Sequence, residues 1–144
     1  NFSMFQPHIV QSLKNLKPIF DKRISVIYAL EAPLYSKYLG VAGRVDCVGM
    51  FDGVPSIIDF KTSAKKKYKK WIENYFIQES AYAIMWEERT GMPCPNLVTI
   101  MDVDNDEPLV FIEHRDNWTK KLLRTIELYK QKQFWNLTQK RGGM

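Results

Sequence analysis

Two β-rich runs separated by an Asp-Gly pair constrain the fold of this chain more than any other feature of its sequence. The runs are Leu39–Met50 and Ser56–Phe60, and Asp52-Gly53 lies between them. An Asp-Gly pair between apolar, β-branched segments is the strongest short-range signal of a β-hairpin. The sequence therefore predicts two antiparallel strands joined by a tight turn.

The length of this turn decides which side chains face one another. With a two-residue turn, Asp46 lies directly opposite Asp59, with their Cβ atoms about 5 Å apart. With a four-residue loop, Asp46 faces Lys61 and Asp59 is its diagonal neighbour. Both alternatives put the three side chains on one face of the sheet, because side chains alternate along a strand. A three-residue loop would separate them.

Two opposed carboxylates in such a sheet repel each other, and partial burial makes the pair costlier. Asp59 follows Ile57-Ile58 and precedes Phe60, the pattern of an interior strand, where a charge needs a partner. Lys61 can offset only part of the repulsion. A divalent cation would neutralise both acids, and oxygen ligands favour Mg²⁺ or Mn²⁺. The alternative is that the acids lie on a solvated face, with Asp59 and Lys61 as a surface ion pair.

The rest of the pattern predicts helices and strands in the order α, β, β, β, α, β, β, α. Pro18 is expected to end the first helix and Pro33 the first strand, Gly91 to cap the second helix, and Asp116 or Asn117 to cap the third. This order favours an α/β fold with a mixed central sheet flanked by helices. Besides the hairpin, the predicted elements are the helices Gln6–Phe20, Tyr68–Thr90 and Asp116–Trp135 and the strands Ile24–Glu31, Leu97–Val103 and Leu109–Glu113.

Composition narrows the possible partners and compartments. The 144 residues suffice for one domain, and no apolar run reaches the roughly 18 residues of a membrane helix. We therefore expect no membrane partner. The net charge of +5 hints at a polyanionic partner. Two widely separated cysteines without metal-ligand spacing indicate a reduced, intracellular compartment.

Three motifs then follow in order: Gly43-x-Val45-Asp46, Ile58-Asp59-Phe60-Lys61-Thr62 and Gln78-x-x-x-Tyr82. Together they resemble the PD-(D/E)XK nuclease superfamily, in particular its RecB-type branch, over residues 24–113. The resemblance implies a restriction-endonuclease-like fold and metal-dependent hydrolysis of phosphodiester bonds. It also implies exonuclease action on single-stranded DNA, including flaps left in mitochondrial DNA replication and repair, and hence a mitochondrial location.

One motif of that branch is missing from the chain. The branch carries Gly-x-x-x-His on a helix before the first strand, and His8 has no such glycine before it. We therefore expect residues 1–144 to form one nuclease domain, a fragment whose upstream helix lies outside this sequence.

The resemblance also assigns roles to the hairpin residues. Asp46, Asp59 and the backbone carbonyl of Phe60 would hold the metal, and Glu31, at the end of the preceding strand, is a further candidate ligand. Lys61 would hold or activate the attacking water and stabilise charge on the phosphate oxygens.

A second group of residues is expected to contact nucleic acid. Gln78 would point at the catalytic centre and Tyr82 would support it or touch the DNA, although both could belong to a core-facing helix stripe. The lysines and aromatics after the hairpin would form an electrostatic and stacking track, or simply a solvated face. Thr62 and Ser63 would bond a phosphate or cap a local turn. The candidates are Gln78, Tyr82, Thr62, Ser63, Lys65, Lys66, Lys67, Tyr68 and Trp71.

Three hypotheses follow. The first is a monomeric, metal-dependent exonuclease acting on single-stranded DNA. The second is a nucleic-acid-binding domain that has a nuclease fold and no catalysis. The third is a basic scaffold domain whose acids and lysines pair on the surface.

Overall fold

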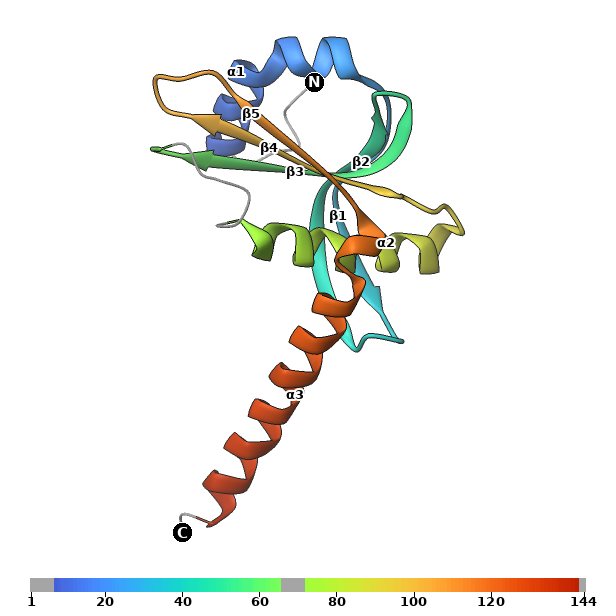
Figure 1. Ribbon diagram of the computed structural model, residues 1–144, viewed down its shortest axis with the longest axis vertical. Coiled ribbons are helices and arrows are strands. Elements are labelled where there is room, and N and C mark those ends of the chain that lie inside the picture. Colours follow the sequence, from blue (N-terminus) through green and yellow to red (C-terminus); the bar gives the residue numbers. More distant parts are fainter. Residues whose placement is uncertain (1–6, 66–71, 143–144) are drawn as a thin grey trace.

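A computed structural model describes residues 7–65 and 72–142 of the chain. Its elements, drawn in Figure 1, are α1 (Pro7–Arg23), β1 (Ile24–Ser36), β2 (Val41–Phe51), β3 (Val54–Ser63), α2 (Glu73–Thr90), β4 (Asn96–Val103), β5 (Leu109–His114), the short 3₁₀ helix η2 (Arg115–Asn117) and α3 (Thr119–Gly142).

The five strands form one sheet in the order β1-β2-β3-β4-β5. Neighbouring strands are antiparallel except β3 and β4, which are parallel. A parallel pair needs a crossover connection, and α2 lies in the segment between these two strands. The predicted α/β class with a mixed sheet is therefore confirmed.

Helices cover both faces of the sheet. In Figure 1, α1 lies above the strands and α2 crosses below them. The neighbouring Ile57 and Ile58 of β3 are both fully buried, one in the core beneath α2 and the other in the cluster that includes Leu16 of α1. Consecutive apolar residues are typical of a strand that is buried on both faces, and Ile57-Ile58 of β3 is such a pair. Asp59, the next residue along β3, consequently lies in the interior of the protein.

The first helix runs past Pro18, which was predicted to end it, and continues to Arg23. Leu16 before the proline is fully buried, and Ile19 and Phe20 after it pack on the same cluster. Proline removes one helix hydrogen bond, but packing of an apolar face supplies most of the stability of a helix in a protein. Tertiary contacts on both sides of Pro18 thus outweigh the local signal.

The prediction that Pro33 ends the first strand is also wrong, since β1 continues to Ser36 and Pro33 pairs with Arg44. β1 is an edge strand, and proline is tolerated there because its nitrogen can face away from the sheet.

Both later helices begin after their predicted starts. α2 begins at Glu73, and Gly91 caps it in the left-handed conformation as predicted, with φ of 74° and its N–H donating to the Glu87 carbonyl. The last helix is preceded by η2, where the His114 side chain accepts the Asp116 N–H, so the expected cap at Asp116 or Asn117 is wrong.

The N-terminal part of α3 packs against α2, where the Trp118 and Phe76 rings lie 5.2 Å apart just before it. The rest of α3 extends away from the body of the protein (Figure 1). None of the described helices is both long and apolar enough to cross a membrane.

Candidate active site

The turn between β2 and β3 is the two-residue turn, the first of the two alternatives that keep the charged side chains together. Phe51 pairs with Val54, and the residues between them have φ of 51° (Asp52) and 79° (Gly53). Positive φ at both positions is typical of a type I′ turn. The Arg23 guanidinium also holds the Asp52 carboxylate, at 2.6 and 3.0 Å. This fixes the register of the hairpin.

The register brings the two aspartates together. The last pair of the ladder is Cys47 with Ile58, so the next residues along, Asp46 and Asp59, are opposite one another. Asp46 Oδ2 accepts the backbone N–H of Phe60 at 2.9 Å. Asp59 is only 3% exposed, and Asp46 is partly buried. The pair thus lies just past the last paired residues of the hairpin, on the face of the sheet that α2 covers.

The electrostatics of this pair show the cost of placing two carboxyl groups together without a bound cation. Burial raises the pKa of Asp46 to about 8, and the hydrogen bond and charge of Asp59 contribute to the rise. Asp59 Oδ2 is buried and accepts no well-directed hydrogen bond from the described residues, although the Lys61 ammonium lies 2.9 Å away. The metal-free protein therefore favours the protonated Asp46 carboxyl up to a higher pH than an ordinary aspartate.

Lys61 completes the cluster. Burial lowers the pKa of its ammonium, but the adjacent Asp59 carboxylate and the charge of Asp46 outweigh that effect, so the pKa is raised. Its Nζ also lies 4.9 Å from the centre of the Tyr75 ring on α2, a cation–π contact. Lys61 is therefore a cation and a hydrogen-bond donor at neutral pH.

The donor set fits a hard divalent cation. Magnesium is commonly held by one or two carboxylates, with the remaining ligands from water and substrate phosphates. The Phe60 carbonyl points to the same side of β3 as its N–H, because both groups of a strand residue face one neighbouring strand, and that N–H binds Asp46. Within the described ranges, no three His, Cys, Asp or Glu side chains cluster closely enough to bind an ion by themselves.

Glu31 is not grouped with these acids. It is opposite Asp46 along the β1–β2 register, but its backbone has a positive φ of 45° and its carbonyl accepts the Arg44 Nε–H. The charges that act on Asp46 are those of Asp59 and Lys61. The structure thus gives no support to Glu31 as a ligand.

Helix α2 brings Tyr82 to the site, but it turns Gln78 outward. Tyr82 is 5% exposed, and its pKa is raised by burial and then by the charges of Asp59 and Asp46. A Cβ on Gly43 would approach the Tyr82 ring to 2.8 Å, so the ring packs directly on β2. Gln78 is exposed, so it does not belong to the buried stripe of α2, and its predicted contact with nucleic acid stays a prediction.

The residue that faces inward is the next one along, Glu79, which the sequence interpretation missed. It is fully buried, and its Oε2 accepts a hydrogen bond from Thr99 Oγ1 on β4. Burial and the charge of Asp59 raise the pKa of Glu79 well above its ordinary value. One signal in the sequence could have identified Glu79 as buried. Its neighbours on the same helix face, Phe76 at i−3 and Ala83 at i+4, are apolar.

The lysine-rich segment after the hairpin is only partly described. Thr62 is exposed, and the Ser63 hydroxyl donates to the Lys65 carbonyl and accepts the Lys65 N–H, which is local turn capping. Lys65 is exposed. Lys66, Lys67, Tyr68 and Trp71 lie outside the described residues, so their predicted contacts with nucleic acid stay predictions.

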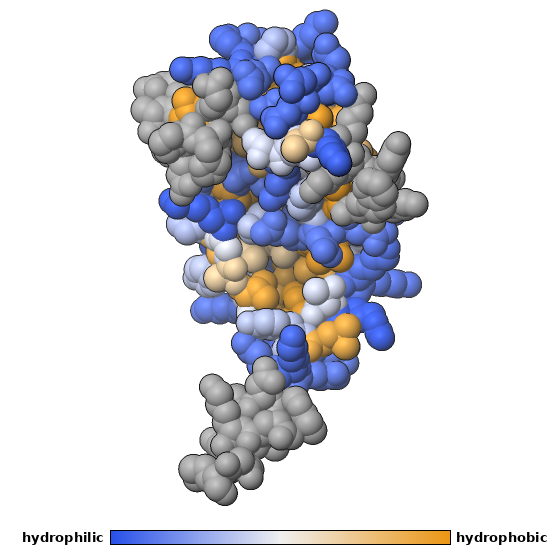
Figure 2. Space-filling view, turned by 90° about the vertical axis from the view of Figure 1, so that its left-hand side faces the viewer, coloured by the Kyte–Doolittle hydropathy of each residue, from blue (hydrophilic) through white to orange (hydrophobic). Residues whose placement is uncertain are grey.

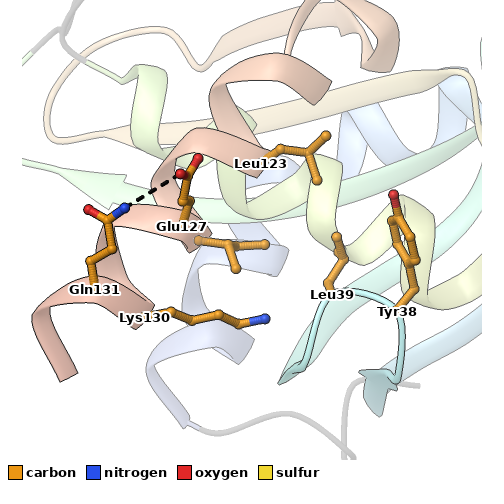
Figure 3. A pocket seen from close by; sticks show the side chains of 7 residues that line it. Tyr38, Leu39, Leu123, Glu127, Lys130 and Gln131 are labelled. Carbon is orange, nitrogen blue, oxygen red and sulfur yellow. Dashed lines mark hydrogen bonds between the residues drawn. The ribbon is translucent and has the colours of Figure 1, made fainter. Parts of the chain in front are cut away.

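A groove lies on another part of the surface, away from the hairpin. It has a volume of about 680 Å³ and runs between the β1–β2 turn and α3 (Figure 3). Apolar side chains also come to the surface on the face shown in Figure 2. None of the predicted site residues that the structure describes lines the groove, which is bordered by Tyr38, Leu39, Leu123, Ile126, Glu127, Lys130 and Gln131.

Comparison with known proteins supports the fold. No protein-family model matches the sequence, and no curated protein matches it. Among solved structures, one match is a protein from Eubacterium rectale described as a putative exonuclease, with a TM-score of 0.56 and 20% sequence identity. The chain shares that protein's fold. The match covers 87% of this chain and 50% of the other, so the chain spans about half the length of that protein.

The charge of Asp46 gives a first test of the site. Because its folded-state pKa is raised, the metal-free protein loses stability as pH rises from about 4 through about 8. Asp46→Asn removes the ionisable group, so we expect the variant to gain stability over the wild type by about 1 kcal/mol or more at pH 9 and by much less at pH 5. Thermal unfolding in EDTA at both values measures this.

The control is Asp52→Asn, at an exposed carboxylate on the same hairpin. The hydrogen bond from Arg23 lowers the pKa of Asp52, so its contribution to stability is present at neutral pH and lost in acid. This variant should gain nothing at pH 9. An equal gain in both variants would mean that general charge on the hairpin, and not the Asp46–Asp59 pair, causes the effect.

Proposed function

We propose that this protein is a metal-dependent deoxyribonuclease that hydrolyses phosphodiester bonds in single-stranded DNA. The observation that carries the proposal is the hairpin register, which brings buried Asp59, partly buried Asp46 and Lys61 into one cluster on the α2 side of the sheet. Two opposed acids, one buried and one partly buried, are costly to a fold, and a divalent cation removes that cost. The shared fold with the Eubacterium rectale protein agrees with this proposal.

Each residue then has a chemical task. Asp46, Asp59 and the Phe60 carbonyl would hold Mg²⁺ or Mn²⁺, which would polarise the phosphate and lower the pKa of the attacking water. Lys61, protonated and beside Asp59, donates hydrogen bonds to phosphate oxygens on which negative charge builds. Tyr75 keeps the ammonium in place through its ring. Tyr82 packs against β2 and closes the inner side of the site.

The finer parts of the proposal rest on the resemblance to the RecB-type branch. At that level the chain is similar to the mitochondrial genome maintenance exonuclease, and we propose exonuclease action on DNA ends or flaps in mitochondria, by a monomer. The net charge of +5 and the exposed Lys65 next to the site suit a single-stranded polyanion.

The test uses labelled single-stranded and duplex DNA with the full-length protein. We expect cleavage of the single strand with Mg²⁺ and none with EDTA. End-labelled and internally labelled substrates separate exonuclease from endonuclease action. Binding without cleavage under all metal conditions would support the rival function, a nucleic-acid-binding domain with a nuclease fold. Neither binding nor cleavage would leave the scaffold hypothesis.

A further inference from the structure

Glu79 is a completely buried acid that the proposed mechanism does not use. Thr99 Oγ1–H donates to its Oε2, while its Oε1 is buried and accepts no hydrogen bond from any described residue. An unsatisfied buried oxygen costs about 1–3 kcal/mol, so its presence in a folded protein needs an explanation.

The position of Glu79 relates it to the aspartates. Thr99 is the register partner of Asp59 on β4, so the Glu79 carboxyl is anchored beside that residue, on the inner side of the cluster. Electrostatically it is coupled to Asp59, Lys61 and Asp46. The charges that act on Glu79 thus come from two acids, Asp59 and Asp46, and one ammonium, that of Lys61.

A purely structural role does not account for an acid here. Joining α2 to β4 requires one acceptor for the Thr99 hydroxyl, and a glutamine supplies that without a buried charge. An apolar side chain of similar volume would often be as stable or more so. What only an acid adds is negative charge once a cation lies beside it, because the cation offsets the burial and the Asp59 charge that favour the neutral carboxyl in the metal-free protein. In a buried site the attraction between that charge and the cation is weakly screened by water.

We propose that Glu79 is a third acid of the cation site, placed behind Asp59, and that it raises the affinity of Asp46 and Asp59 for a divalent cation. This inference rests on the function proposed above. Glu79 acts through the neighbouring aspartates and is thus a positioning residue, distinct from the ligands themselves.

The experiment measures Mn²⁺ binding to the full-length protein without DNA, by electron paramagnetic resonance. Glu79→Gln keeps the size and an acceptor for Thr99, and we expect it to bind Mn²⁺ about tenfold more weakly, the usual effect of losing a residue behind a ligand. Glu79→Leu also removes the acid and should show a similar loss of Mn²⁺ affinity. It keeps the test valid if Glu79→Gln fails to fold. Cleavage by Glu79→Gln should approach the wild-type rate at saturating Mn²⁺.

Thr99→Val is the matched control, because it removes the hydrogen bond and keeps the acid. We expect its Mn²⁺ affinity to stay within about threefold of wild type, well short of the tenfold loss typical of residues behind a metal ligand. If Thr99→Val weakens binding while Glu79→Gln binds like wild type, Glu79 is only a clamp and the inference is overturned.

One more variant separates failure of this inference from failure of the proposed function. Asp59→Asn should abolish Mn²⁺ binding if the hairpin is the cation site. Wild-type protein that binds no Mn²⁺, or Asp59→Asn protein that binds it normally, would overturn the proposed function and this inference with it. Mn²⁺ binding that is lost in Asp59→Asn and unchanged in Glu79→Gln and Glu79→Leu would overturn the inference alone.

Discussion

Replacing Lys61 by alanine should lower the rate of DNA cleavage by about 100-fold or more while DNA binding is largely retained. The reason is that the ammonium lies beside Asp59, where under the proposed function it would stabilise charge that develops only in the transition state. Loss of one such donor costs roughly 10²–10³ in rate. Single-turnover cleavage at saturating Mg²⁺ measures the chemical step, and fluorescence anisotropy in Ca²⁺ measures binding.

The control is Lys120→Ala, which removes the same charge from an exposed position on α3. It lowers the net charge equally, so any change in long-range attraction for DNA is shared by both variants. We expect its cleavage rate to match the wild type. Wild-type cleavage by Lys61→Ala would defeat the role assigned to Lys61, and a proportional loss of binding would make Lys61 a DNA contact instead of a catalytic group.

The hairpin could be predicted from the sequence because its signals are local. An Asp-Gly pair adopts the positive φ angles of the tight turn, and period-two alternation then places Asp46, Asp59 and Lys61 on one face. The choice between a two-residue and a four-residue turn was left open by the sequence. The structure decides it partly through the contact from Arg23 to Asp52, which joins residues far apart along the chain.

That Glu79 is buried while Gln78 is exposed could not be predicted so directly. One step along a helix rotates a side chain by about 100°, so the inward residue depends on how α2 is turned about its axis. That rotation is set by tertiary packing of the buried Phe76, Tyr82 and Ala83 against the sheet. A motif match gives the helix and its approximate position, but it does not give this angle.

Glu31 is another residue whose surroundings could not be predicted from the local sequence. Its position after a β-rich run suggested an acid at a strand end, yet β1 continues, and the residue occupies an irregular point of the strand with a positive φ. The strand continues because β1 is at the edge of the sheet, a property of the assembled fold.

Replacing Gly49 by alanine should destabilise the protein by about 2–3 kcal/mol, near the upper part of the range for overpacking. The backbone angle of Gly49 does not require glycine, since it is not among the positive-φ residues. Instead, an added Cβ would lie 2.5 Å from the Val26 carbonyl oxygen on β1, and a backbone atom cannot move aside as a flexible side chain can. β1 would have to separate locally from β2, the strand that carries Asp46.

Gly53→Ala is the matched control. At Gly49 the added Cβ clashes and the backbone angle is ordinary, whereas at Gly53 the backbone angle is strained and the Cβ has free space. Gly53 has φ of 79° and nothing within 4 Å of its added Cβ, so the substitution brings backbone strain without a clash. Left-handed strain costs about 1–2 kcal/mol. Thermal unfolding should therefore show Gly49→Ala melting several degrees below Gly53→Ala, with both below the wild type. If Gly53→Ala is the less stable of the two, β1 yields easily at Val26, and the clash with the Val26 carbonyl is not the main cost of a side chain at Gly49.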